Sequence, residues 1–290
     1  MKFSIILCTY GRNKVIFDFI KSLSEQNYKN FELIIIDQNI DNSLLKNINI
    51  YNKYMSIKYI RSLKGLSRSR NVGLSYATGD ILCFPDDDCT YPSELLKNIN
   101  DLFRYNLEVD FLLGRAIERD TEKIIAGKKI TKSMVVNCKY FGGSSITLFI
   151  NRKRERVKFF CFDEEFGMGA TFPSEEENDL VMRMLQNGKK GLYMPEKNYV
   201  FHPDKDSNYF NLKRAGERGY GFGALVAKHI LSTCGMSYFL RYFLIRVPVS
   251  IVFNVIAGNI RKSKYNLVKY LNMWRGFSFY IFTFSLKIKK

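Results

Sequence analysis

Two short apolar runs separated by a helical pattern constrain the fold of this chain most. Phe3–Cys8 and Glu32–Ile36 are rich in β-branched residues, as parallel strands covered on both faces are. Between them, Lys14–Gln26 has apolar residues at helical spacing. The pattern predicts a β-α-β unit with a right-handed crossover.

The alternation of strands and helices continues through the first half of the chain. Further strands are expected at Ile57–Arg61, Asp80–Phe84 and Asp110–Gly114, and further helices at Ser67–Ala77 and Pro92–Tyr105. We therefore expect an α/β fold with an open, mainly parallel twisted sheet flanked by helices. Such sheets bind ligands beyond the carboxyl ends of their strands.

The second half is less regular, and we place soft boundaries near residues 115 and 215. Lys123–Lys139 is expected to be polar and irregular, Gly142–Ile150 to be a strand, and Glu175–Asn187 to be a helix. The expected parts are residues 1–115 and 116–215, two halves of one domain, and a helical, basic and aromatic extension over residues 216–290.

The strongest chemical signal is the acidic run Asp86-Asp87-Asp88 directly after the strand Asp80–Phe84. Adjacent carboxylates repel one another, and a compensating cation relieves that repulsion. Carboxylates and diphosphate oxygens are common ligands of a divalent metal such as Mg²⁺ or Mn²⁺. The alternative is a solvated turn that caps the helix beginning near Pro92.

Polar residues also follow the other strands of this predicted sheet. Thr9–Arg12 comes after the first strand, Asp37 ends the second, and Gly65–Gly73 brings Arg68 and Arg70 to the start of a helix, a site that favours anions. Each residue alone could belong to a turn or a surface. Together they fall on the same edge of one sheet, which favours a single ligand site.

As a set, these motifs resemble in order and spacing those of the family 2 glycosyltransferases, which have the GT-A fold. The resemblance covers about residues 1–205. It implies that the nucleoside is held by Thr9, Tyr10, Arg12 and Asp37. It also implies that Arg70 and Asn71 lie close to the nucleotide, and that the DxD pair consists of Asp86, near the ribose and metal, and Asp88, on the metal. Residues 1–115 would then bind the nucleotide sugar, and residues 116–215 the acceptor.

A second acidic cluster offers a general base for the attacking hydroxyl. The family commonly carries Glu-Asp-x-Asp-Leu here, with the Asp of the first pair as base, and this chain has Glu176-Glu177-Asn178-Asp179-Leu180. The matching residue is Glu177, and its longer side chain leaves Glu176 as the alternative. Acidic residues at a helix start also complement the helix dipole without any catalytic role.

The chain contains two histidines. His202 follows a strand-like segment, and some related enzymes place a histidine there to complete the metal shell, although a lone histidine is often structural. His229 lies in a basic helical stretch and is expected at a surface or an interface.

The net charge of +17 comes mainly from the C-terminal segment, which has 12 Lys or Arg residues, 15 aromatic residues and no acid from Arg218 to Lys290. Its apolar part is interrupted by Arg241, Arg246 and Pro248, so it falls short of a transmembrane helix. This composition favours the membrane interface. A helical packing or dimerisation domain is the alternative, and no nucleic-acid-binding motif is present.

The N-terminal apolar run Phe3–Leu7 is too short for a signal peptide, so a cytoplasmic protein is expected, peripheral at the inner face of the cell membrane. The resemblance implies an inverting, metal-dependent transfer of a sugar from a nucleotide-diphosphate sugar. UDP is expected from its frequency in the family. The acceptor would be a hydroxyl of a glycan or polyprenyl-linked saccharide in O-antigen or capsule synthesis, and a homo-oligomer is possible.

Two other functions remain open from the sequence. A nucleotidyltransferase also uses an α/β sheet and metal-binding acids, but it should carry a Gly-rich, Lys-containing phosphate loop, of which Thr9–Arg12 is a poor version. A catalytically inactive scaffold at the membrane is the other. The joint presence of the acidic run, the base candidate and the cations argues against it.

Overall fold

The computed structural model describes residues 1–12, 14–41, 43–127, 130, 132–138, 143–153, 157–204 and 211–284. The chain forms two compact units. The first comprises Met1–Phe162 and Asn187–Lys205, and the second comprises Asp163–Gln186 and Asp206–Lys290. The sequence-based division into three parts assigns functions rather than packing units, and it stays a prediction.

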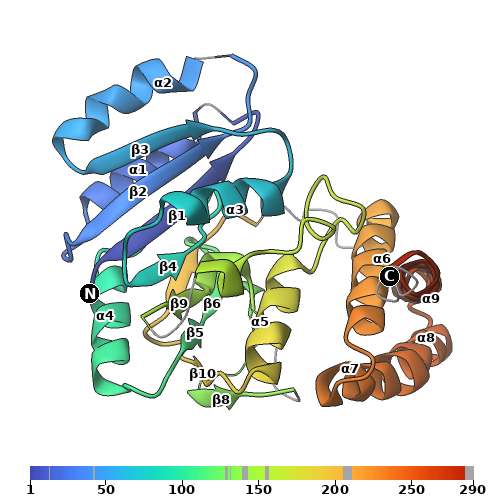
Figure 1. Cartoon of the computed structure of the whole chain (residues 1–290). Coiled ribbons are helices and arrows are strands. Elements are labelled where there is room, and N and C mark those ends of the chain that lie inside the picture. The colour runs from blue at the N-terminus through green and yellow to red at the C-terminus, as the bar shows by residue number, and fades with distance from the viewer. Residues whose placement is uncertain are drawn as a thin grey trace. The chain divides into compact units, whose positions relative to one another are not determined.

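The first unit is built on an eight-stranded sheet in the order β3-β2-β1-β4-β9-β5-β10-β8 (Figure 1). Its strands are β1 (Phe3–Thr9), β2 (Phe31–Asp37), β3 (Ser56–Arg61), β4 (Ile81–Cys83), β5 (Phe111–Leu113), β8 (Met134–Val136), β9 (Phe149–Asn151) and β10 (Gly191–Tyr193). Strands β3, β2, β1 and β4 run parallel, as do β5 and β10. Strand β9 is antiparallel to β4 and β5, and β8 to β10. The expected mainly parallel sheet is confirmed.

A smaller sheet joins β11 (Tyr199–Phe201), β6 (Arg115–Ile117) and β7 (Ile124–Ala126). The expectation that Lys123–Lys139 is irregular is wrong where β7 and β8 form. Each of these strands has three residues, too few to show a clear alternation. Strand β7 pairs with the nearby β6, whereas β8 pairs with β10, which is distant in the sequence. The strand expected over Gly142–Ile150 begins later, at Phe149, after the 3₁₀ turn η2 (Ser145–Thr147), and Gly142 lies outside the described residues.

Helices cover both faces of the parallel strands. Helices α1 (Ile16–Ser24), α2 (Ser43–Ile48) and α4 (Leu95–Tyr105) contribute to one apolar core with alternate residues of β1 and β2. Helix α3 (Leu66–Tyr76) lies on the other face, where Gly73 contacts Ile6 and Ile36. Burial of both faces explains why the β1 sequence is continuously apolar. Short 3₁₀ segments η1 (Asn49–Lys53) and η3 (Val157–Phe160) complete this unit.

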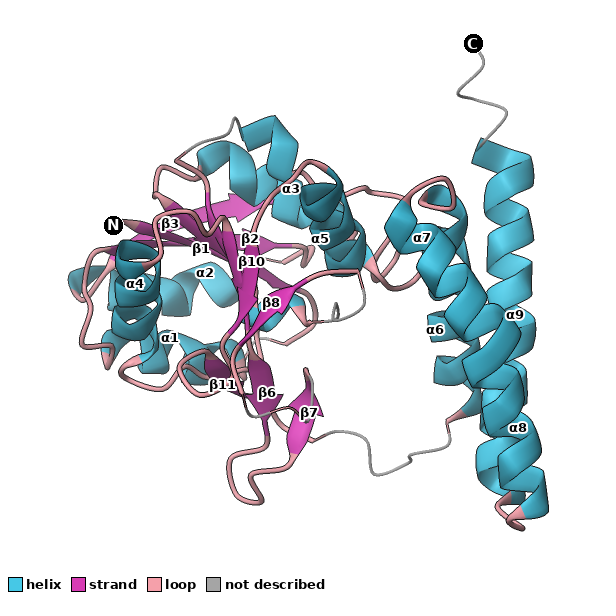
Figure 2. Ribbon diagram, turned by 90° about the horizontal axis from the view of Figure 1, so that it is seen from below, coloured by secondary structure: helices cyan, strands magenta, loops and turns pink. Residues whose placement is uncertain are grey.

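The second unit is helical, as expected for the basic extension. It comprises α5 (Glu176–Gln186), α6 (Leu212–Lys228), α7 (Thr233–Tyr238), the π-helical segment η4 (Phe239–Arg246), α8 (Val247–Ile256) and α9 (Ile260–Phe284). Helices α6 and α9 pack closely along their lengths (Figure 2). A Cβ atom added to Gly223 would lie 1.9 Å from the Met273 carbonyl oxygen, and one on Gly276 would lie 2.0 Å from that of Tyr220. Glycine is therefore required where the two backbones meet.

Candidate active site

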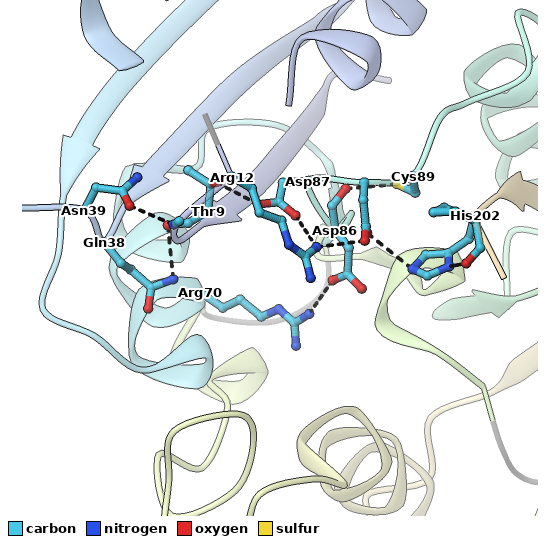
Figure 3. A network of polar contacts seen from close by, with 12 residues as sticks. Thr9, Arg12, Gln38, Asn39, Arg70, Asp86, Asp87, Cys89 and His202 are labelled. Atoms are coloured by element: carbon cyan, nitrogen blue, oxygen red, sulfur yellow. Dashed lines mark hydrogen bonds and ion pairs between the residues drawn. The ribbon is translucent and has the colours of Figure 1, made fainter. Parts of the chain in front are cut away.

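The ends of β1, β2 and β4 bring the predicted polar residues to one edge of the sheet (Figure 3). Thr9 lies opposite Asp37 in the β1–β2 register, and Cys8 forms a parallel bridge with Asp86 beyond β4. In a parallel sheet this carboxyl edge is where ligands bind. The convergence inferred from the sequence is thus present in the structure.

Asp87 and Asp88 share one guanidinium. Arg12 Nη1 donates to Asp87 Oδ1 at 2.8 Å and to Asp88 Oδ2 at 2.7 Å, and Thr9 Oγ1 donates to Asp87 Oδ2 at 2.7 Å. Burial lowers the pKa of Arg12, but the two carboxylates outweigh burial and raise it. Asp87 therefore ties the end of β1 to the acidic run, and Arg12 offsets part of the negative charge there.

Arg70 brings a second positive charge to the same edge from within the protein. Its side chain is almost fully buried, and Nη2 donates to Ser145 Oγ at 2.8 Å and lies 3.5 Å from Asp86 Oδ1 (Figure 3). The guanidinium also lies 5.2 Å from the centre of the Phe162 ring. A buried cation needs such partners, so Arg70 is held in a fixed position beside Asp86.

Asp86, Asp88 and His202 form a group that can hold a metal ion. One potential ligand atom from each lies within 4.8 Å of the others. His202 Nε2 lies 3.3 Å from Asp88 Oδ1, and Nδ1 lies 2.9 Å from the Pro203 carbonyl oxygen, to which a protonated Nδ1 donates. That hydrogen bond leaves Nε2 available as a ligand in the neutral ring. Two carboxylates and one imidazole fit a divalent cation such as Mn²⁺.

Asp37 is fully buried and held by its own loop. Its Oδ1 accepts hydrogen bonds from Asn39 N at 2.8 Å and Asn39 Nδ2 at 2.7 Å, and its Oδ2 accepts one from the Tyr59 hydroxyl. Burial and this contact raise the pKa of Tyr59. Asp37 thus shapes the loop after β2, and its contact with a nucleoside stays a prediction.

Asn71 braces the backbone at the end of the first unit. Its Nδ2 donates to the Phe162 carbonyl oxygen at 2.9 Å, and Phe162 N donates to its Oδ1 at 2.8 Å. The side-chain amide thus satisfies both the backbone N–H and the carbonyl of Phe162, as an adjacent strand does in a sheet. Tyr10, in contrast, is half exposed, with Lys64 Nζ 4.4 Å from its ring centre. Both remain predicted neighbours of the nucleotide.

The candidate bases Glu176 and Glu177 occupy the first turn of α5, in the second unit. Glu176 is buried and Glu177 is half-buried. The preceding residue, Glu175, has a left-handed backbone with φ of 78°, and burial raises the pKa of its carboxyl. Non-glycine residues in this region are strained and are frequent at functional sites.

Asp179 anchors the same helix through a network that the sequence did not reveal. Its fully buried carboxylate lies 2.6 Å from Lys228 Nζ, 2.8 Å from His229 Nε2 and 2.9 Å from Arg183 Nε. Burial raises the pKa of Asp179, but the His229 hydrogen bond and the two cations outweigh burial and lower it.

The expectation of a surface position for His229 is wrong. Its ring is buried, with Asp179 on Nε2 and Gln186 Nε2 2.8 Å from Nδ1. Packing of α5 against the end of α6 creates this site from residues about 50 positions apart, and no local pattern in α6 signals it.

The family model of glycosyl transferase family 2 matches residues 4–161, more than half of the chain. This chain belongs to glycosyl transferase family 2. The amylovoran biosynthesis glycosyltransferase AmsB of Erwinia amylovora is 31% identical over 76% of this glycosyltransferase and 73% of AmsB. The Escherichia coli enzyme WfgD, a UDP-Glc:alpha-D-GlcNAc-diphosphoundecaprenol beta-1,3-glucosyltransferase, is 27% identical over 51% of this chain and 60% of its own.

Solved structures show the same fold for this glycosyltransferase. Residues 1–349 of S. aureus TarS in complex with UDP-GlcNAc align with a TM-score of 0.61 and 17% identity, over 93% of this chain and 90% of that TarS fragment. The mannosyltransferase PcManGT of Pyrobaculum calidifontis, in complex with GDP-Man and Mn²⁺, aligns with a TM-score of 0.64 and 11% identity, over 94% and 87%. The expected GT-A fold is confirmed.

Proposed function

We propose that this enzyme transfers a sugar, with inversion, from a UDP-sugar to a hydroxyl of a polyprenyl-linked glycan in the synthesis of a cell-surface polysaccharide such as O-antigen or capsule. The observation that carries the proposal is the grouping of Asp86, Asp88 and His202 at the carboxyl edge of the sheet. The family places nucleotide-sugar chemistry at this edge.

Asp86, Asp88 and His202 are the residues that would hold Mn²⁺ or Mg²⁺. When bound, the cation would supply positive charge against the diphosphate of the donor and the leaving nucleotide. The Mn²⁺ in the PcManGT complex supports this assignment. The assignment rests on three potential metal ligands: two carboxylates separated by one residue, and a histidine directly after β11.

Arg12 and Arg70 supply fixed positive charge beside the leaving diphosphate. Both guanidiniums are already oriented by the acidic run, so they require little rearrangement when the donor binds. Tyr10, half exposed at the end of β1, offers an aromatic surface to the nucleoside. Thr9 and Asp37 would support that side of the pocket, and Asn71 would hold the neighbouring backbone.

Glu177 is our proposed general base. It accepts the proton of the acceptor hydroxyl while the hydroxyl oxygen forms a bond to the anomeric carbon, and the bond from that carbon to the diphosphate oxygen breaks. A single displacement of this kind inverts the anomeric configuration. Glu177 has the position of the family's base and is more exposed than Glu176, which supports the choice between them.

The acceptor class and the location of the enzyme are proposed from its relatives. WfgD acts on a diphosphoundecaprenol-linked sugar, and a Campylobacter jejuni relative, 27% identical over 57% of this chain, is a glucosyltransferase acting on GalNAc(5)-diNAcBac-PP-undecaprenol. Polyprenyl carriers reside in membranes. We therefore place the enzyme at the cytoplasmic face of the cell membrane, with its basic helical segment toward the lipid.

Donor binding followed by product analysis tests the function. The purified chain is titrated calorimetrically with UDP, GDP and dTDP sugars, with and without Mn²⁺, and the best donor is incubated with a polyprenyl-linked saccharide. We expect Mn²⁺-dependent binding and release of the nucleoside diphosphate. Release of pyrophosphate from a nucleoside triphosphate and a sugar phosphate would support the nucleotidyltransferase instead. Absence of metal-dependent nucleotide binding would support the inactive scaffold.

A further inference from the structure

Helices α8 and α9 form an antiparallel hairpin that turns at residues 257–259 (Figure 2). Two hydrogen bonds join the helices near this turn. Ser263 Oγ donates to the Ile251 carbonyl oxygen at 3.1 Å, and Asn266 Nδ2 donates to Ser250 Oγ at 2.9 Å. Farther along, the Tyr270 hydroxyl donates to the Phe243 carbonyl oxygen at 3.0 Å. The hairpin is therefore a defined structural element.

The interior of the hairpin near its turn is polar. Asn254 is 2% exposed, and its Nδ2 donates to the Ser250 carbonyl oxygen at 2.6 Å. Ser263, from the facing helix, is 6% exposed. Small hydroxyl and amide side chains that hydrogen-bond across a helix pair are typical of helices in lipid. In water-soluble proteins the apolar side of a helix faces the interior.

The outer face of α8 is apolar. Val249, Val252, Phe253 and Ile256 follow one another at helical spacing, and Ile256 is 81% exposed. Ile245 extends this row into η4, and Ile260 extends it to the start of α9. A continuous exposed apolar row of this kind marks a surface that binds a partner or a membrane. Near its turn, the hairpin thus has polar residues inside and apolar residues outside, whereas the first unit has its apolar residues inside.

Charge distinguishes a membrane from a second copy of the chain. Arg261, Lys262 and Lys264 are exposed on α9, and Arg246 is exposed at the end of η4, directly before α8. No acidic residue occurs from Arg218 onward. Anionic lipid headgroups complement such cations while the acyl region takes the apolar row. A second copy of the hairpin would instead oppose like charges.

The arrangement favours a helix lying in the interface over one that crosses the bilayer. The stretch Thr233–Ile256 is long and apolar enough to span a membrane by length and composition. However, Arg241 and Arg246 interrupt it, and the charge-free helix α8 has 10 residues. That length corresponds to about 15 Å, half of a hydrocarbon core of about 30 Å.

We propose that the outer face of α8 and the start of α9 dock in the interface of an anionic bilayer. Val249, Val252, Phe253 and Ile256 enter the upper acyl region, and the exposed cations of the hairpin contact the headgroups. This inference deepens the proposed function and rests on its membrane location. Its test measures lipid binding directly and does not require sugar transfer.

Vesicle flotation of the full chain tests the docking face. We compare vesicles of phosphatidylcholine with vesicles that also contain phosphatidylglycerol. The double variant Phe253→Ser and Ile256→Ser should lose at least about tenfold in binding, because two apolar side chains no longer enter the acyl region. The matched control is Ile40→Ser with Leu63→Ser, two exposed apolar residues of the first unit, which should bind as the parent does.

Two further variants test charge and depth. Replacing Arg261 and Lys262 by Gln should reduce the preference for anionic vesicles several-fold, because each cation near the surface attracts anionic lipid. Trp274 is the single tryptophan of the chain, so Phe253→Trp in a Trp274→Phe background reports on one position. Its fluorescence should be quenched most by lipids brominated near the headgroup end of the acyl chain.

Three results would overturn the inference. In the first, the serine variant floats with vesicles as the parent does. In the second, tryptophan fluorescence is quenched most strongly by lipids brominated at the bilayer centre. In the third, the parent is a dimer, and the serine substitutions make it monomeric without reducing flotation. A transfer assay with a water-soluble saccharide acceptor distinguishes failure of the docking from failure of the proposed function. If the serine variant no longer floats but still transfers sugar to the soluble acceptor, both the docking and the proposed function are supported. Flotation without transfer by the parent means that the proposed function fails while the docking stands.

Discussion

The chain carries two acidic clusters that are built in different ways. Asp86–Asp88 follows a strand at the edge of the sheet, whereas Glu176 and Glu177 begin helix α5, directly after Glu175. Each cluster is supported by one buried carboxylate that is paired with cations. Asp87 fills this role in the first cluster through Arg12. Asp179, just beyond the second cluster, fills it through Lys228 and Arg183.

The difference lies in what the remaining carboxylates can do together. Asp86 and Asp88 converge with His202 closely enough to share one ion. Glu176 and Glu177 are consecutive helical residues, so their side chains point about 100° apart around the helix. A strand end thus suits a metal site, whereas a helix start keeps its carboxylates apart, and we propose the role of proton acceptor for Glu177 alone.

Removing a carboxylate from the strand-end cluster should have the largest effect. Asp88→Ala should reduce sugar transfer by at least about 10⁴-fold and weaken Mn²⁺-dependent nucleotide binding, since one of three metal ligands is lost. Calorimetry and a transfer assay measure the two effects. The exposed Asp120→Ala variant is the control, and retained Mn²⁺-dependent binding in Asp88→Ala would contradict the assignment.

In the helical cluster, Glu177→Gln should lower kcat by about 10²–10⁴-fold, because the amide cannot accept the acceptor proton. Donor binding with Mn²⁺ should remain near that of the parent. Glu176→Gln is the matched control and should retain most activity. If Glu176→Gln instead lowers kcat and Glu177→Gln retains most activity, Glu176 is the base.

Asp179, the buried carboxylate that supports the second cluster, should contribute to the free energy of unfolding. Asp179→Asn keeps the shape of the side chain but removes one of the two carboxylates that pair with Lys228, whose Nζ also lies 2.7 Å from Asp163 Oδ2. The loss should cost about 1.5–3 kcal/mol of unfolding free energy. Urea unfolding measures this loss. The exposed pair Lys213–Glu217 provides the comparison, because Glu217→Gln should change stability by less than about 0.5 kcal/mol.

Another buried acid, Glu32, lies near the start of β2, away from the carboxyl edge, and should affect only stability. Burial raises its pKa, but hydrogen bonds from Ser4 and Thr78 outweigh burial and lower it from 4.5 to about 2. Its stabilising contribution is therefore complete above about pH 4.5 and is lost as the pH falls toward 2.

Glu32→Gln should flatten the pH dependence of unfolding free energy between these values and leave transfer activity at neutral pH nearly unchanged. The exposed glutamate variant Glu108→Gln should keep the slope of the parent. A steep acid-induced loss of stability that survives in Glu32→Gln would assign that loss to other carboxylates.

The sheet edge could be predicted because its signals are local and ordered. Long apolar runs define β1 and β2, and the polar residue that follows each run must lie at the same edge. Strand β7 escaped prediction because three residues are too few to show an alternation, and β8 because its pairing partner β10 is distant in the sequence. For the same reason the sequence did not reveal that Asn71 holds Phe162 or that His229 meets Asp179.

The glycines of α6 also determine when the second unit can fold. Gly216, Gly219, Gly221 and Gly223 together disfavour an isolated α6 helix by about 4 kcal/mol relative to alanine. Packing against α9 offsets this, and α9 ends at Phe284, near the end of the chain. During synthesis α6 therefore becomes stable only after α9 has been made. Lys228 and His229, which hold Asp179 of α5, reach their final positions only then, so the helix that carries the candidate base is fixed after α9 is made rather than when α5 itself is made.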